Sequence, residues 1–289
     1  MTEPRMTREQ FERDDFNDRC LFTGVPIEGK KKGEHVIPRW LIADYGLQNQ
    51  RIEMGDAVHQ ATMKDFRSPA DPVANGKFGD LENKIKCGLA SIDELHLWQK
   101  KISTGMALNH WRMARNVRHP GAPLPFDARY LAFALQDFRK EFGEYLEGRY
   151  VRTGSTLCLP TRIPSGWLVH AFGTTVREHD ASHDALLPFG LVALSHCGKL
   201  IVSVLFDARR RFEALRLKQE WSALRLDVSE SPLPIQAALA VGLTECITAA
   251  SETAFGEPPA FDPLFEHIAY QLGIEVDPAT AQYRARAAR

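Results

Sequence analysis

The sequence predicts an α+β protein in which short irregular segments are followed by a pair of helices and then by an antiparallel sheet. Apolar side chains recur every three or four residues over 91–118 and 127–148, as in amphipathic helices. Runs of β-branched and aromatic residues dominate 151–206, as in strands. At about 150 residues per domain, the chain length suggests two domains, which we place at 1–90 and 91–289.

The first 90 residues lack the pattern of a self-sufficient core. Residues 1–17 are charged and resemble a short arm, and residues 19–90 are rich in Gly, Pro, Asp and Asn. Such a stretch usually needs a metal or a docking partner to fold. The start of the chain has no apolar signal region, and no run approaches the length of a membrane span. We therefore expect a cytoplasmic protein that has no membrane partner.

Two helices are predicted next. Ser91 can cap the first, which should end near Arg118 before a Pro-Gly pair, and Asp127 opens the second, which should stop around Gly148. The segment 121–126 between them is a linker.

The strand region separates into four runs, and two later segments are predicted to be helices. The last two runs should form a hairpin around Cys197-Gly198. The resulting C-terminal sheet could serve as a homodimer surface, a surface for a protein partner, a ligand sensor or a scaffold. The strands are expected at 151–159, 167–176, 189–195 and 199–206, and the later helices at 235–255 and 262–273.

The residues that indicate chemistry lie near the N-terminus. Glu34 and His35 are adjacent, and Pro38 limits how the strand that holds them continues. A carboxylate is a ligand that hard divalent cations prefer, and an imidazole can take a proton from water. This combination suits metal-assisted hydrolysis.

The segments GEHVIPRWL at 33–41 and NGKFGDLE at 75–82 resemble the HNH (ββα-metal) endonucleases. The most similar variety has a CxxC zinc knuckle, then EHxxPxW, then CNNGWxxxLE, and the resemblance covers roughly residues 19–110. The chain departs from this pattern at four positions. Thr23 and Val73 stand where the family has cysteines, Ala74 stands where it has the first Asn, and Lys77 stands where it has Trp.

The resemblance implies an N-terminal ββα-metal module and a role for four residues. His35 would be the general base, Glu34 and Glu82 would bind one Mg²⁺ or Mn²⁺ ion, and Asn75 would orient the histidine. The implied activity is hydrolysis of phosphodiester bonds in DNA, with RNA as the other candidate substrate, and the implied role is defence against foreign DNA.

Other interpretations of the same residues remain open. Glu82 also fits an ordinary charged helix start, and Asn75-Gly76 also fits a plain turn. Structural zinc is not expected, because Cys20 and Cys87 cannot complete a tetrahedral site. Burial of three apolar side chains against the later helices could replace it, and suitable residues are Phe22, Val73 and Phe78.

Basic residues flank this segment. No acidic residue occurs between Leu95 and Phe126, so the helix there could neutralise phosphates, or it could present a solvated face or a partner surface. The candidate nucleic-acid contacts are Lys30, Lys31, Lys32, Arg39, Lys100, Lys101, Arg112 and Arg115.

Two other functions compete with the nuclease. The first is an HNH-like module that kept the fold and lost the chemistry, and that binds nucleic acid or protein. The second is an unrelated activity in the C-terminal two-thirds. Glu34, His35, Asn75 and Glu82 should converge around one cavity flanked by basic residues if the site is competent.

Overall fold

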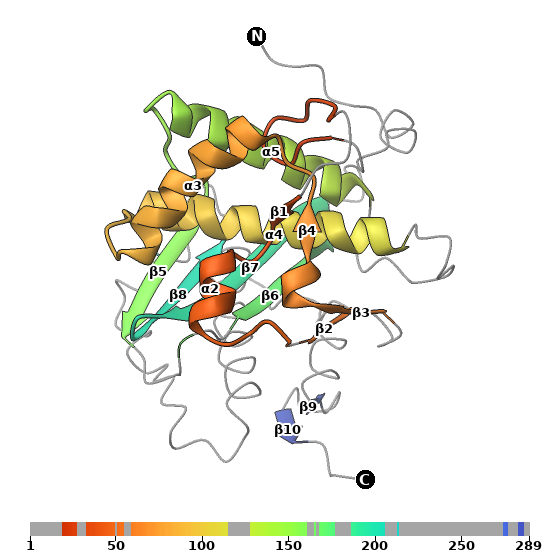
Figure 1. The fold of residues 1–289 in the computed structure, drawn as a ribbon. Coiled ribbons are helices and arrows are strands. Elements are labelled where there is room, and N and C mark those ends of the chain that lie inside the picture. Colours follow the sequence, from red (N-terminus) through yellow and green to blue (C-terminus); the bar gives the residue numbers. More distant parts are fainter. Residues whose placement is uncertain are drawn as a thin grey trace. The chain divides into compact units, whose positions relative to one another are not determined.

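The structure is a computed structural model, and it forms two compact units, Met1–Arg152 and Thr153–Arg289. Helices and small antiparallel sheets together make an α+β protein, as predicted from the sequence (Figure 1). The first unit ends after the predicted helix pair, and not before it, because these helices supply the core that residues 19–90 lack. The described residues are 19–27, 33–49, 51–54, 59–114, 128–160, 165, 168–176, 186–205, 213, 274–276 and 283–285.

The N-terminal part of the first unit is built from short strands and two helices. Strand β1 pairs antiparallel with β4, so that Glu34 lies opposite Ser68 and His35 opposite Arg67. Gly33 is required for this close pairing, because a Cβ atom there would lie 2.6 Å from the Ser68 carbonyl oxygen. The elements are β1 (Glu34–His35), α2 (Arg39–Asp44), the β2 (Arg51–Met54) and β3 (His59–Thr62) pair, the 3₁₀ turn Met63–Asp65, β4 (Arg67–Ser68) and α3 (Pro72–Lys86).

Helix α3 occupies a segment in which the sequence also allowed a turn. Asp71 caps it by accepting hydrogen bonds from the main-chain N–H groups of Val73 and Ala74, at 3.0 and 3.1 Å. Pro72 holds the first helical position. Asn75-Gly76 therefore lies in the first turns of a helix, and the plain-turn interpretation is corrected. The buried face is formed by Ala74, Phe78, Leu81 and Ile85, which are spaced as a helix requires.

Helix α4 (Ile92–Ala114) is the central element of the first unit. All of its residues from 97 to 109 are buried, and it packs against α3, β4 and α5 (Ala128–Leu146) (Figure 1). Its predicted cap is present, because Ser91 Oγ accepts from the Glu94 N–H at 3.2 Å and Glu94 Oε2 accepts from the Ser91 N–H at 2.9 Å. Residues 115–118, where we expected this helix to end, lie outside the described residues.

A cluster of phenylalanine rings joins the N-terminal turn to α3 and α5. The rings of Phe22, Phe78, Phe138 and Phe142 lie with their centroids 5.1–6.2 Å apart, and all four side chains are buried. Phe22 and Phe78 thus pack against the later helices as predicted from the sequence. Val73 does not, since it is 68% exposed.

Polar contacts fix the turn at residues 20–24, where the family has its first zinc-knuckle cysteines. The Asp71 N–H donates to Cys20 Sγ at 3.2 Å. Arg139, which projects from α5, donates to the carbonyl oxygens of Cys20 and Leu21 at 3.0 and 3.2 Å. This turn is therefore held by a guanidinium group and an aromatic cluster.

Substitution Arg139→Ala should lower the free energy of unfolding by about 1–3 kcal/mol, because two largely buried carbonyl groups lose their charged donor. Urea unfolding followed by circular dichroism measures the change. Lys140→Ala removes an exposed cation from the next position of α5 and serves as the control. Equal stability of the two variants would show that Arg139 does not support the turn.

The second unit contains the predicted antiparallel sheet. The strand order is β5-β8-β7-β6, and β7 and β8 form the predicted hairpin through Cys197 and Gly198, whose φ angles are +50° and +70°. Two further short strands, β9 (Ile274–Val276) and β10 (Tyr283–Ala285), pair with each other. The sheet strands are β5 (Ser155–Pro160), β6 (Leu168–Val176), β7 (Leu186–His196) and β8 (Lys199–Val204).

Three further expectations concern segments that the structure does not describe. The N-terminal arm at 1–17 and the helices expected at 235–255 and 262–273 lie outside the described residues. Within the described part of the chain, no helix has both the length and the apolar character needed to cross a bilayer.

Candidate active site

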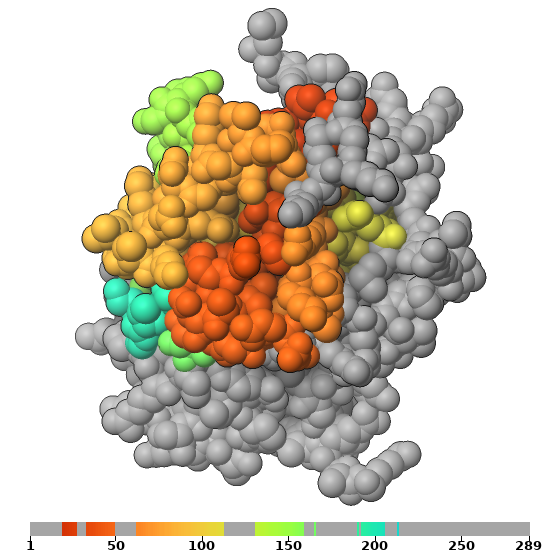
Figure 2. Space-filling view, in the orientation of Figure 1, coloured from red at the N-terminus to blue at the C-terminus, as the bar shows by residue number. Residues whose placement is uncertain are grey.

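A pocket of about 420 Å³ brings together residues of β1, α2 and α3. Figure 2 shows the surface of segment 33–49 next to that of α3, where these elements meet. Glu34, His35 and Glu82, which the sequence singled out, all line this pocket, and so does Arg39. The complete lining is Glu34, His35, Arg39, Trp40, Ala43, Asp44, Glu82 and Lys86.

The local sequence explains how these side chains meet. Strand β1 is only two residues long, and α2 begins directly after Pro38, whose carbonyl oxygen accepts from the Ile42 N–H at 3.1 Å. Glu82 follows the buried Leu81 on α3 and therefore lies at the edge of the buried face of that helix. A strand end, a helix start and a helix edge thus face one pocket.

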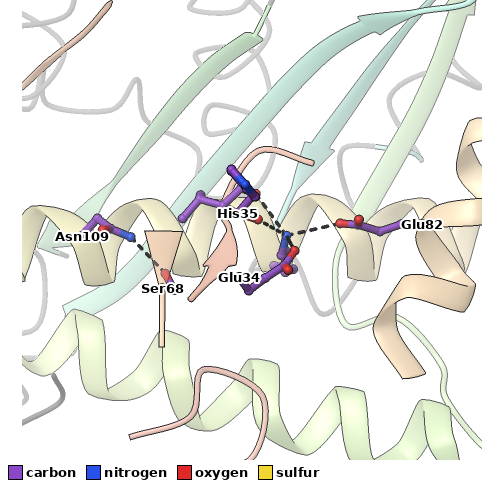
Figure 3. Close-up of polar contacts among 7 residues, drawn as sticks. Glu34, His35, Ser68, Glu82 and Asn109 are labelled. Carbon is purple, nitrogen blue, oxygen red and sulfur yellow. Dashed lines mark hydrogen bonds and ion pairs between the residues drawn. The ribbon is translucent and has the colours of Figure 1, made fainter. Parts of the chain in front are cut away.

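The most unexpected feature of the site is the side chain of Lys101. Its ammonium nitrogen lies 2.7 Å from Glu34 Oε1 and 3.2 Å from Glu82 Oε1, and it also donates to the carbonyl oxygens of His35 and Val36 at 2.5 and 3.3 Å. In Figure 3 the dashed lines from Glu34, His35 and Glu82 converge on this one nitrogen. The Lys101 side chain is fully buried, so it joins the two carboxylates from beneath the pocket.

Close packing of α4 against the end of β1 brings Lys101 to this position. A Cβ atom at Gly105 would lie 3.0 Å from both Val36 methyl groups, so any other residue there would require the Val36 side chain to shift by a few tenths of an ångström. Lys101 lies one helical turn before Gly105 and three residues after the buried Trp98. A lysine at such a core position is rarely buried without a partner, and this spacing was the signal in the sequence that could have revealed its role.

The surroundings shift the pKa values of the three ionisable side chains. Burial raises the pKa of Glu82, although Lys101 opposes this effect. Burial alone would lower the pKa of Lys101, but the carboxylates of Glu82 and Glu34 hold it above its usual value, so the group is an ammonium. Burial and the neighbouring Arg67 lower the pKa of His35, so its imidazole is mainly neutral near pH 7 and can accept a proton.

While the Lys101 ammonium is in place, a divalent cation cannot bind the two carboxylate oxygens that accept from it, Glu34 Oε1 and Glu82 Oε1. Mg²⁺ needs ligand oxygens at about 2.0–2.1 Å, and one oxygen of each carboxylate already accepts from Lys101. Among the described residues, no group of three or more His, Cys, Asp or Glu side chains could hold a metal ion.

Two cations, Arg39 and Lys86, line the pocket together with a third carboxylate, Asp44. Arg39 is exposed on α2, and Lys86 Nζ lies 6.0 Å from the centre of the Trp40 ring and 3.6 Å from Asp44 Oδ2. The Trp40 ring in turn stacks on Trp98 of α4, with centroids 6.2 Å apart. The sequence did not single out Lys86, because only the fold of α3 brings it to the pocket that Arg39 also lines.

Several other predicted contacts lie elsewhere. Asn75 is two turns before Glu82 on α3 and does not line the pocket. Lys100 and Lys101, which we expected to contact phosphates, are fully buried in ion pairs, Lys100 with Asp137 and Glu141 of α5. The predictions that Asn75 lies in the site and that Lys100 and Lys101 contact phosphates are therefore corrected.

Of the remaining basic candidates, the structure describes Arg112, which does not line the pocket. Arg112 is half-buried and donates to the Arg67 carbonyl oxygen at 3.0 Å. Lys30, Lys31, Lys32 and Arg115 lie outside the described residues.

Comparisons of the chain with protein-family models, with curated proteins and with solved structures found no match.

Proposed function

We propose that this protein is an HNH-like endonuclease that hydrolyses phosphodiester bonds in DNA, with His35 as the general base. The observation that supports the proposal is the convergence of Glu34, His35 and Glu82 in one pocket beside two cations. The order of elements supports it as well, because an antiparallel strand pair, β1 and β4, precedes the helix that carries Glu82. The resemblance implies a strand-strand-helix order, and here α2, β2, β3 and the 3₁₀ turn lie between the two paired strands.

The lining residues suggest a division of roles in the reaction. The neutral His35 imidazole takes a proton from a water molecule while the water oxygen attacks phosphorus. The bond from phosphorus to the leaving sugar oxygen breaks, and that oxygen takes a proton from solvent. Arg39 and Lys86 neutralise the phosphate oxygens, on which negative charge develops. Lys101 holds the main chain of His35 through its bond to the carbonyl oxygen of that residue.

The proposal is tested by nicking of supercoiled plasmid DNA, together with binding of a DNA duplex at several salt concentrations. The wild-type protein should do both. Arg39→Ala and Lys86→Ala should weaken binding, and each should reduce the slope of log affinity against log salt by about one, because each removes one phosphate contact.

Lys77→Ala is the matched control for these variants. Lys77 is also an exposed cation of α3, but it does not line the pocket, so its removal should leave the salt slope unchanged. Equal effects of Lys77→Ala and Lys86→Ala would place the DNA elsewhere on the protein. A wild-type protein that neither binds nor cuts DNA would contradict the proposal.

The Lys101 contacts favour a second candidate function, a module that binds nucleic acid without hydrolysing it. Metal-dependent HNH chemistry needs a cation beside the Glu-His pair, and Lys101 fills the space between the two carboxylates. Salt-sensitive DNA binding without nicking, by a protein whose Arg39→Ala variant binds less tightly, would support this function over the nuclease.

A further inference from the structure

We propose that the Lys101 ammonium takes the place of the divalent cation in this site, so that the protein binds no Mg²⁺ or Mn²⁺ between Glu34 and Glu82. This inference deepens the proposed nuclease function, on which its catalytic meaning rests. Its physical content concerns one buried side chain and the four oxygen atoms around it.

The four oxygens around Lys101 are of the kind that hard cations bind. Two come from carboxylates on different elements, Glu34 on β1 and Glu82 on α3, and two are main-chain carbonyl oxygens of residues 35 and 36. Carboxylate and carbonyl oxygens are also the usual ligands of Mg²⁺ and Ca²⁺. Their distances of 2.5–3.3 Å from the nitrogen are those of hydrogen bonds, so the oxygens are arranged around an ammonium.

The position of Lys101 is fixed by the fold. Its side chain is fully buried, and it extends from α4, where Gly105 packs against Val36 one turn later. Glu34 and Glu82 keep only 12% and 14% of their side-chain surface exposed, so solvent screens the repulsion between their charges only weakly. The ammonium offsets one of these two negative charges and stabilises the pair. A divalent ion at the same oxygens would have to displace it.

The neighbouring Lys100 shows that a buried lysine with two carboxylate partners does not by itself have this role. The role depends on where the carboxylates lie. Lys100 is equally buried and also has two carboxylate partners, Asp137 and Glu141, but both are on α5 and neither lines the pocket. Lys100 thus joins two helices, whereas Lys101 joins the two carboxylates that the resemblance assigns to a metal. Lys101 acts as a positioning residue, because its burial keeps it from touching a substrate.

Titration with Mn²⁺, followed by calorimetry and by the electron paramagnetic resonance of the free ion, tests the inference. The wild type and the matched variant Lys100→Met should show no saturable binding that depends on the carboxylates of Glu34 and Glu82. Lys101→Met should bind one Mn²⁺ per chain, because it frees both carboxylates without adding a charge. The triple variant Lys101→Met/Glu34→Gln/Glu82→Gln should lose that ion.

Two results would overturn the inference. One is a wild-type protein that binds one Mn²⁺ and loses it in Glu34→Gln/Glu82→Gln. The other is a folded Lys101→Met that binds no Mn²⁺, because removal of the ammonium would then have opened no cation position. If circular dichroism shows that Lys101→Met is unfolded, the comparison of the wild type with Glu34→Gln/Glu82→Gln decides alone. The readout of this test is ion binding and not DNA cleavage. A protein that does not cleave DNA would contradict the nuclease proposal, but it would not change the result of the Mn²⁺ titration.

Discussion

Substitution His35→Ala is expected to slow plasmid nicking about 10²- to 10⁴-fold, the usual contribution of a positioned general base. The imidazole lies in the pocket, and burial and Arg67 hold its pKa below the ordinary value, so most molecules near pH 7 carry the base in its neutral form. The rate of conversion of supercoiled to nicked plasmid under single-turnover conditions measures the effect. Binding of DNA should change little, because Arg39 and Lys86 remain.

A second histidine provides the control for this loss. His110 is half-buried on α4 and does not line the pocket, so His110→Ala should nick plasmid at nearly the wild-type rate. A His35→Ala protein that is folded and nicks as fast as His110→Ala would remove His35 from the mechanism. The pocket would then be a binding site only.

Substitution Lys101→Met should lower the free energy of unfolding by about 3–5 kcal/mol, the usual cost of removing one partner from a buried ion pair. The change leaves the Glu34 and Glu82 carboxylates close together with no buried counter-charge between them. Urea unfolding followed by circular dichroism, in a buffer with EDTA, measures this loss without a contribution from bound ions.

The triple variant Lys101→Met/Glu34→Gln/Glu82→Gln separates charge from packing. It removes the two carboxylate charges together with the ammonium, so it should recover a large part of the stability that Lys101→Met loses. If the triple variant is no more stable than Lys101→Met, the loss would come from packing, and the charge cluster would not stabilise the fold. A Lys101→Met protein as stable as the wild type would show that the contacts of Lys101 with Glu34 and Glu82 do not stabilise the fold.

The periodic parts of the sequence predicted the fold well. Helices α4 and α5 follow from apolar residues spaced by three and four, and the strands and the β7-β8 hairpin follow from β-branched runs around a two-residue turn. Helix α3 was not expected to start at Pro72, because Asn75-Gly76 is typical of turns. The Asp71 cap and the buried Phe78 outweigh that local preference.

The candidate site was predicted in part. Glu34, His35 and Glu82 line one pocket, but Asn75, which the resemblance placed with them, does not. Lys101 was expected on a solvated or phosphate-binding face, because the basic charge of the helix is evident in the sequence and its burial is not. Its true partners are 19 and more residues away in the sequence, and only the packing of α4 on β1 and α3 brings them together.

In the proposed site the Lys101 ammonium lies between Glu34 and Glu82, in the position that a metal ion would otherwise take. Anomalous diffraction from crystals of the full chain soaked in Mn²⁺ tests it most directly. The structure predicts continuous density for the Lys101 side chain between the two carboxylates and no anomalous peak there. An anomalous peak bonded to both carboxylates, with Lys101 displaced from them, would contradict the claim.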